Sequence, residues 1–187
     1  MDTLELIFFF VISGYVITSS LIRRQVKDFS EFIIGFYVRR IKRLVPALSV
    51  FVLVMSTLIC LFNKYPGYSL MTGLASLFGL SNLYLLNQAT DYFAQYPASN
   101  IFTHTWSLGV EEQFYVIFPL LIWFTGFGRK TKQGIRNLFI TLSFLSILSI
   151  TGFISIYSTN QSAAYFLMPL RFWEMSSGCL IFIGLYK

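Results

Sequence analysis

The sequence predicts an all-α membrane protein, a polytopic transmembrane helical bundle with about five full spans and one weak or re-entrant segment. Hydrophobic residues make up 56% of the 187 residues and charged residues only 12%, whereas roughly 25% are charged in ordinary soluble domains. The mean hydropathy is +0.67. Apolar runs of about 20 residues, the length that crosses a bilayer as a helix, recur along the chain between short polar or basic stretches.

The first two spans are predicted at residues 4–22 and 44–62. The first run contains one charge, Glu5, and has neither a basic segment before it nor a small-residue cleavage site, so it is typical of a span and not of a signal peptide. An arginine pair follows it, and such basic residues mark the cytoplasmic side. Residues 29–43 mix apolar and basic residues at helical spacing, which predicts a helix lying in the cytoplasmic interface that leads into the second span.

Three further spans are predicted at residues 106–124, 137–156 and 168–186. A second basic stretch, residues 129–136, follows the first of them. If both basic stretches face the cytoplasm, an even number of full crossings separates them, and the second and third spans already provide two.

Residues 70–86 form a weaker apolar run that glycines, a serine and an asparagine interrupt. The even number of crossings makes this segment re-entrant or interfacial, because irregular backbone at membrane depth is tolerated where protein buries it or where it lines a cavity. The alternative is a full crossing that places residues 129–136 outside. The charge rule favours the re-entrant arrangement.

Other protein classes find little support. Basic residues exceed acidic ones by 14 to 8, but they cluster beside apolar runs, which indicates topology and not nucleic-acid binding. Cys60 and Cys179 lie in apolar stretches without partner spacing, so neither a disulfide framework nor a metal site is predicted. GxSxG, Walker, GxGxxG and HExxH motifs do not occur, which leaves soluble-type hydrolases, nucleotidases and zincins without support.

Charged residues at the starts of two spans are candidates for a functional site. Glu111 and Glu112 begin the span at 106–124, with the single histidine, His104, just before it, and Arg171 and Glu174 begin the last span. Around one membrane cavity these residue types could deprotonate a hydroxyl and stabilise an oxyanion. The alternative is structural: carboxylates in a first helical turn offset the helix dipole, and the arginine and glutamate three residues apart can pair.

Two further groups are open to two interpretations. Tyr115 shares a helix face with Glu111, four residues earlier, and can be its hydrogen-bond partner or an aromatic of the membrane interface. Arg39, Arg40 and Arg43 can bind the phosphates of a soluble donor or anchor the chain as cytoplasmic positive charges.

Four segments in series resemble acyltransferase family 3, the membrane O-acyltransferases that move acyl groups onto sugars of lipopolysaccharide O-antigen, peptidoglycan and related glycans. They are FFFVISGYVIT at Phe8–Thr18, FYVRRIKRLVPAL at Phe36–Leu48, HTWSLGVEEQFYVIFPLL at His104–Leu121 and LRFWEMSSG at Leu170–Gly178, and SNLY at Ser81–Tyr84 fits as well. The resemblance implies an acyl-CoA donor, acetyl-CoA above all, on the cytoplasmic side of a bacterial inner membrane. It also implies a glycan or lipid-linked sugar acceptor.

By position, the resemblance assigns roles to the candidate residues. Arg40 and Arg43 fill an RxxR pair that, with Arg39, binds donor phosphates. Glu111 or Glu112, with Tyr115, acts near the acceptor. Arg171 and Glu174 fill the family's RxWE group, in which Arg171 positions or stabilises charge. His104, which is part of the HTWSL segment, remains a candidate catalytic residue.

The chain also departs from the family pattern. Members have about ten spans and begin with one more helix, whose arginine and histidine are thought essential, and they have an aspartate where Ile7 stands. We therefore expect residues 1–187 to be a partial domain, truncated at both ends, with little transferase activity alone and a possible partner polypeptide for the absent helices. The alternative function is a non-catalytic membrane protein or a transporter-like subunit.

Overall fold

The computed structural model describes residues 3–22, 28–92, 100–127 and 132–185, and every regular element within these ranges is a helix. In chain order the helices are α1 (Thr3–Ile22), α2 (Phe29–Phe62), α3 (Gly67–Leu77), α4 (Ser81–Tyr92), the short 3-10 helix η1 (Ile101–His104), α5 (Thr105–Phe124), α6 (Lys132–Tyr157), α7 (Gln161–Phe166) and α8 (Met168–Leu185).

Five of the described helical stretches are long and apolar enough to cross a membrane. They are Leu4–Ile22, Phe29–Phe62, Ile101–Phe124, Gln133–Tyr157 and Gln161–Leu185. The predicted fold class, an all-α bundle with several membrane spans, is confirmed, and the chain is a multi-pass membrane protein.

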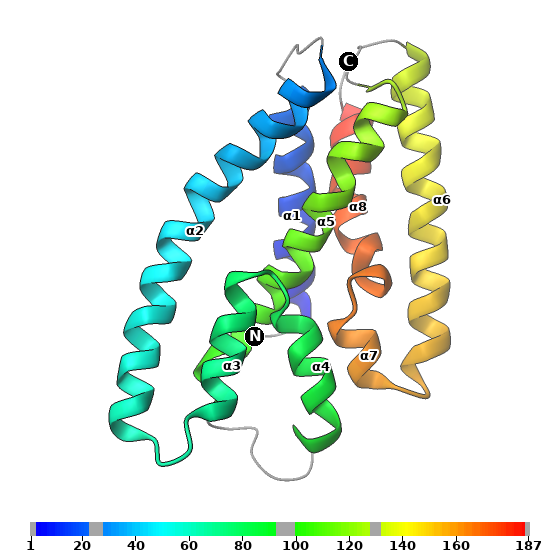
Figure 1. The fold of residues 1–187 in the computed structure, drawn as a ribbon. Coiled ribbons are helices and arrows are strands. Elements are labelled where there is room, and N and C mark those ends of the chain that lie inside the picture. Colours follow the sequence, from blue (N-terminus) through cyan, green and yellow to red (C-terminus); the bar gives the residue numbers. More distant parts are fainter. Residues whose placement is uncertain (1–2, 23–27, 93–99, 128–131, 186–187) are drawn as a thin grey trace.

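The long helices alternate in direction. α1, α5 and α8 run one way and α2 and α6 the other, so that α2 and α6 begin at the upper end of Figure 1 and α1, α5 and α8 begin nearer the lower end. The described basic residues of the second basic stretch, Lys132 and Arg136, are in the first turns of α6 at that upper end. The arginines of α2 precede the middle of their helix. Arg23, Arg24, Lys27, Arg129 and Lys130 lie outside the described residues.

The segment at residues 70–86 consists of two helices, α3 and α4, that form a hairpin. They have 11 and 12 residues, about 17–18 Å each, and neither is long enough to span a bilayer. Phe78–Leu80 join them, and Gly79 has a φ of +67°, a conformation that glycine adopts readily. Both outer ends of the hairpin point to the lower end in Figure 1, as a re-entrant segment requires.

α2 differs from the prediction of a separate interfacial helix before residue 44. It is one continuous helix of 34 residues that Pro46 does not break, and its N-cap, Asp28, accepts a hydrogen bond from the backbone of Glu31. Its first half contacts α5 through side chains, since Phe32 is buried and its ring centroid lies 5.8 Å from that of Trp123. The predicted helix and the predicted second span are thus continuous, and the placement of residues 29–43 in the membrane interface stays a prediction.

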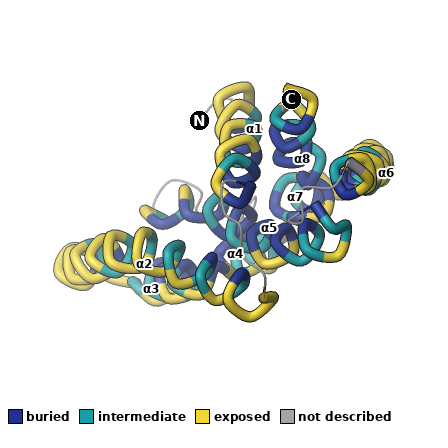
Figure 2. Tube along the Cα trace, turned by 90° about the horizontal axis from the view of Figure 1, so that it is seen from above, coloured by how far each residue is buried: buried dark blue, intermediate teal, exposed yellow. Residues whose placement is uncertain are grey.

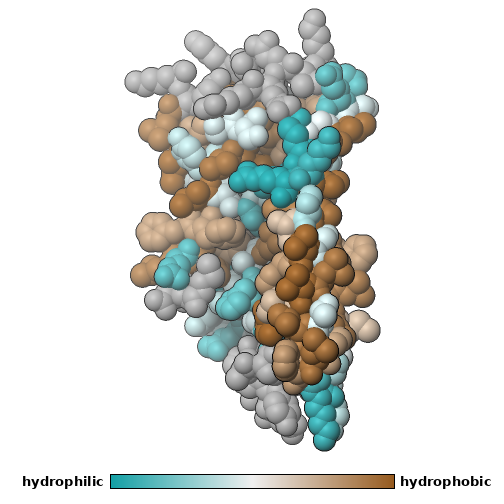
Figure 3. Space-filling model, turned by 90° about the vertical axis from the view of Figure 1, so that its left-hand side faces the viewer, coloured by the Kyte–Doolittle hydropathy of each residue, from teal (hydrophilic) through white to brown (hydrophobic). Residues whose placement is uncertain are grey.

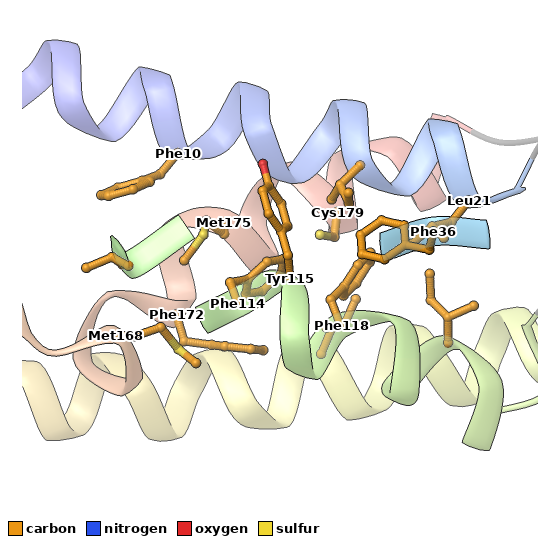
Figure 4. Close-up of a cluster of buried hydrophobic side chains, with 14 of the residues drawn as sticks. Phe10, Leu21, Phe36, Phe114, Tyr115, Phe118, Met168, Phe172, Met175 and Cys179 are labelled. Atoms are coloured by element: carbon orange, nitrogen blue, oxygen red, sulfur yellow. The ribbon is translucent and has the colours of Figure 1, made fainter. Parts of the chain in front are cut away.

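The core lies between α1, α5 and α8, and it includes Phe10, Phe114, Phe118 and Met175 (Figure 4). Figure 2 shows the buried residues gathered between these helices, while α2 and α6 are exposed along most of their length. The exposed side chains of α2 and α6 are mainly apolar, which suits contact with lipid.

Two glycines allow α1 and α8 to touch through their backbones. A Cβ on Gly14 would lie 1.9 Å from the Met175 carbonyl oxygen, and a Cβ on Gly178 would lie 1.9 Å from the Val11 carbonyl oxygen. Small residues at such crossings are the usual means of close helix packing in membranes. The glycines of the VISG and SSG segments therefore fix α1 against α8, and Ser13, next to Gly14, is fixed with them.

Candidate active site

A cluster of polar side chains from three helices forms the centre of the candidate site. The Oε1 atom of Glu111, on α5, accepts short hydrogen bonds from the hydroxyl groups of Ser13, on α1, and Tyr115, on α5. Glu111 and Tyr115 are both buried. Figure 4 shows the Tyr115 hydroxyl pointing from α5 towards α1. The predicted pairing of Tyr115 with Glu111 is confirmed.

Arg40 of α2 joins this cluster through an aromatic face. Its guanidinium carbon lies 3.7 Å from the centroid of the Tyr115 ring, an arrangement in which the cation is attracted to the ring quadrupole. One turn earlier, the Tyr37 hydroxyl donates to the Val116 carbonyl oxygen at 3.1 Å. These contacts hold α2 against α5, so an arginine predicted to act on the donor lies beside a tyrosine predicted to act near the acceptor.

The cluster lies at mid-depth in the bundle. Ser13 is the eleventh of 20 residues in α1, and Tyr115 is the eleventh of 20 in α5. A carboxylate and a guanidinium at mid-depth of membrane helices are costly, and they mark a functional site by default.

The other two arginines of α2 are placed differently. Arg43 is exposed and Arg39 half-buried, and Arg39 folds back over Gly35, since its Nη1 atom lies 3.1 Å from where a Cβ on that glycine would be. Figure 3, which views the face that α2 forms, shows hydrophilic side chains in its upper half above a largely apolar surface. The structure thus brings Arg40 to Tyr115 and leaves Arg43 on the outside of α2.

Glu112 follows Glu111 but has different surroundings. It is half-buried, and no described residue donates a hydrogen bond to its carboxylate. Its Oε2 atom lies against the tip of the α3–α4 hairpin, where a Cβ on Gly79 would be 2.3 Å away.

Side-chain amides attach this hairpin to α5. The Gln113 amide nitrogen donates to the side-chain oxygen of Asn82 at 2.8 Å and to the Gly79 carbonyl oxygen at 3.2 Å. The Asn82 amide nitrogen donates to the Phe166 carbonyl oxygen at 2.9 Å. The Ser81 hydroxyl donates to the Thr105 carbonyl oxygen at 2.8 Å. The serine and asparagine of the SNLY segment thus join the hairpin to α5 and α7.

Arg171 and Glu174 form a buried ion pair of their own. The Arg171 Nη1 atom donates to both carboxylate oxygens of Glu174, at 2.9 and 3.0 Å, and its Nε atom donates to the Tyr165 carbonyl oxygen at 2.9 Å. The guanidinium also lies over the rings of Trp106 and Tyr165, at 5.3 and 4.7 Å from their centroids. Trp106 precedes Glu111 by five residues, about 7.5 Å along α5, so the ion pair is nearer the start of that helix.

His104 ends η1, directly before α5, and its side chain makes no capping hydrogen bond to α5. It is about 10 Å from Glu111 along the helix axis. No group of three or more metal-ligand side chains occurs in the part of the chain that the structure describes.

Sequence reasoning missed Ser13, Asn82 and Gln113. Each is an uncharged polar residue within a segment that carries the family resemblance, and that position was the only available signal.

The sequence is similar to several known proteins. A family model described as an acyltransferase domain matches residues 6–186. The O-acetyltransferase OatA of Staphylococcus aureus is 35% identical over 175 residues, which cover 92% of this chain and 28% of that protein. The peptidoglycan O-acetyltransferase OatA of Listeria monocytogenes is 30% identical over 174 residues, with the same two coverages. A Haemophilus influenzae protein of uncharacterized function is 39% identical over 184 residues, which cover 94% of this chain and 72% of that protein. No solved structure matches.

Proposed function

The chain belongs to the acyltransferase 3 family, and from this premise we propose that it takes part in moving an acetyl group onto a carbohydrate hydroxyl of the cell envelope. The chain spans 28% of the length of its OatA relatives, so the activity of the whole protein is part of this proposal. The observation that carries it is the mid-depth cluster of Ser13, Glu111, Tyr115 and Arg40.

The chemistry of this cluster suits acyl transfer to an alcohol. Such a reaction needs a group that orients or deprotonates the attacking hydroxyl and a positive group or donor that stabilises the oxyanion. Glu111, oriented by two hydroxyl donors, provides the first kind of group. Arg40, held on the face of Tyr115, provides the second.

We propose acyl-CoA, in particular acetyl-CoA, as the donor. Arg40 and Arg43 lie one turn apart on α2, with Arg39 beside them, and guanidinium groups bind phosphates by paired hydrogen bonds. The inward position of Arg40 and the outward position of Arg43 support a donor whose phosphates stay near the outer surface of α2 while its acyl end reaches Tyr115.

We propose peptidoglycan as the acceptor ahead of lipopolysaccharide O-antigen, because the name of the Listeria relative states peptidoglycan. A bacterial plasma (inner) membrane suits this acceptor, since its glycan units are assembled there.

The experiment is deletion of the gene followed by measurement of O-acetyl groups per sugar in the purified envelope glycan. Complementation is done in cells, so that any partner polypeptide that provides further helices is present. Wild type should restore acetylation and Glu111→Gln should not. Tyr115→Phe should restore it only in part, with a loss of about 10- to 100-fold in rate, because a hydrogen bond to a charged group contributes about 1.5–3 kcal/mol.

Tyr157→Phe is the matched control, since Tyr157 is exposed at the end of α6, and it should behave as wild type. A deletion strain whose acetylation per sugar is unchanged while glycan export changes would contradict the proposal and favour a transporter-like subunit.

A further inference from the structure

We propose that the tip of the α3–α4 hairpin, Phe78–Leu80, is a positioning element that holds the Glu112 carboxylate in place. The contacts of the hairpin tip support this positioning role. The effect of the hairpin on catalysis rests on the proposed function.

The two neighbouring glutamates of α5 differ in the hydrogen bonds that their carboxylates accept. Hydrogen bonds from Ser13 and Tyr115 fix Glu111. Glu112 receives no hydrogen bond from any residue that the structure describes, although it is half-buried and within electrostatic range of Arg40 and Glu111. Packing against the hairpin therefore restricts where this carboxylate lies.

The residue that packs against the Glu112 carboxylate is Gly79, at the tip of the hairpin. The space beside Glu112 Oε2 is filled by the backbone of Gly79, where even one added methyl group would be only 2.3 Å away. Gly79 is also in the left-handed region, at φ +67°. Both properties favour glycine, because an added methyl group would displace the flexible end of the Glu112 side chain and strain the turn.

The tip of the hairpin cannot move away from α5 without breaking several hydrogen bonds. Gln113, the residue after Glu112, donates to both Gly79 and Asn82. Asn82 is completely buried. On the same side of α5, Gly109 has no room for a Cβ, which would lie 2.9 Å from the Asn82 side-chain oxygen. The hairpin, Gln113 and Glu112 therefore form one packed unit.

The test compares Gly79→Ala with Gly126→Ala. Gly126 has a φ of +75°, and no atom of a described residue lies within 4 Å of its Cβ position. Both substitutions therefore introduce the same kind of backbone strain, but only one touches Glu112. The purified chain in detergent is treated with dicyclohexylcarbodiimide, a hydrophobic reagent for carboxyl groups. Mass spectrometry then measures labelling of Glu112, with Glu174 as internal reference.

Gly79→Ala should change the labelling of Glu112 by about threefold or more, because the added methyl group forces its carboxylate into another rotamer. Gly126→Ala should leave labelling at the wild-type level. Gln113→Ala, which adds no atoms and removes the tether, should also change labelling, and it decides the question if Gly79→Ala does not fold. Equal labelling in Gly79→Ala and Gly126→Ala, or wild-type labelling in Gln113→Ala, would overturn the proposal.

Acetylation in cells separates positioning from general damage. Gly79→Ala should lower the rate about tenfold or more, since small misplacements of a reacting group have effects of this size. Asp at position 112 is shorter and leaves room for the methyl group, so Gly79→Ala should have little further effect in a Glu112→Asp background. An equal loss in both backgrounds would contradict the positioning role. If the wild-type gene does not restore acetylation to the deletion strain, the proposed function fails, and labelling alone decides the role of the hairpin.

Discussion

Arg171 and Glu174 show how the same two residues can satisfy two opposite interpretations until a structure is known. Charges within a membrane span indicate function, whereas a spacing of three residues indicates a mutual pair. The structure shows the pair, with both side chains almost fully buried and additional contacts from Tyr165 and Trp106. The ion pair thus joins the start of α8 to α7 and α5.

We predict that Arg171→Leu alone destabilises the protein more than Arg171→Leu combined with Glu174→Leu. Removing one partner leaves an uncompensated buried charge, which costs about 3–5 kcal/mol, whereas replacing both partners by apolar residues is often neutral. Thermal unfolding of the purified variants in detergent measures the difference. Lys64→Ala, at an exposed position, is the control. Additive losses from the two single substitutions would show that the pair has no mutual dependence.

The part of the site that sequence could predict is the local part. Tyr115 and Glu111 are four residues apart on one helix, so their hydrogen bond follows from helix geometry. Ser13 and Arg40 come from α1 and α2, and which of their faces meets α5 depends on how the helices pack. A single sequence carries no direct signal for that contact.

At the level of elements, the lengths of apolar runs predicted the helices well except for α2. Residues 29–43 contain enough basic residues to suggest an interfacial helix, but Phe32 and Phe36 find a buried place against the core. The two predicted elements are one continuous helix in the structure.

The close contact between α1 and α8 makes stability sensitive to substitution of Gly178, and Gly184 on the same helix provides the control. Gly178→Ala should lower the melting temperature, because its Cβ would overlap the Val11 carbonyl oxygen and such overpacking costs about 1–3 kcal/mol or more. Gly184→Ala, also on α8 but with no described residue near its Cβ, should be neutral or slightly stabilising, since alanine favours a helix over glycine by about 1 kcal/mol. Differential scanning fluorimetry of both variants measures this. Equal melting temperatures would mean that the two helices can separate freely.

At the scale of the whole molecule, the hairpin decides on which side of the membrane the ends of the neighbouring helices lie. If α3 and α4 enter and leave on one side, α5 is the single crossing between residue 65 and residue 133. A full crossing at 70–86 would place these two residues on the same side.

We predict that Tyr65→Cys and Gln133→Cys, each in a chain with Cys60 and Cys179 replaced by alanine, are labelled from opposite sides of the membrane. Tyr65 and Gln133 are exposed between α2 and α3 and at the start of α6, respectively. A membrane-impermeant maleimide should react with Cys at position 65 in intact cells and with Cys at position 133 only after permeabilisation, because basic residues near position 133 favour the cytoplasm. Labelling of both from one side would rule out the re-entrant hairpin.

The length of α2 makes the site sensitive to the lipids around it. Its 34 residues extend about 51 Å, whereas the hydrocarbon core of a bilayer is about 30 Å thick. A helix of this length leans in the bilayer or extends its basic first half, residues 29–43, beyond the hydrocarbon. Because most of α2 is exposed, acyl-chain length in the surrounding lipids helps to set its angle, and thereby how closely Arg40 approaches the Tyr115 ring.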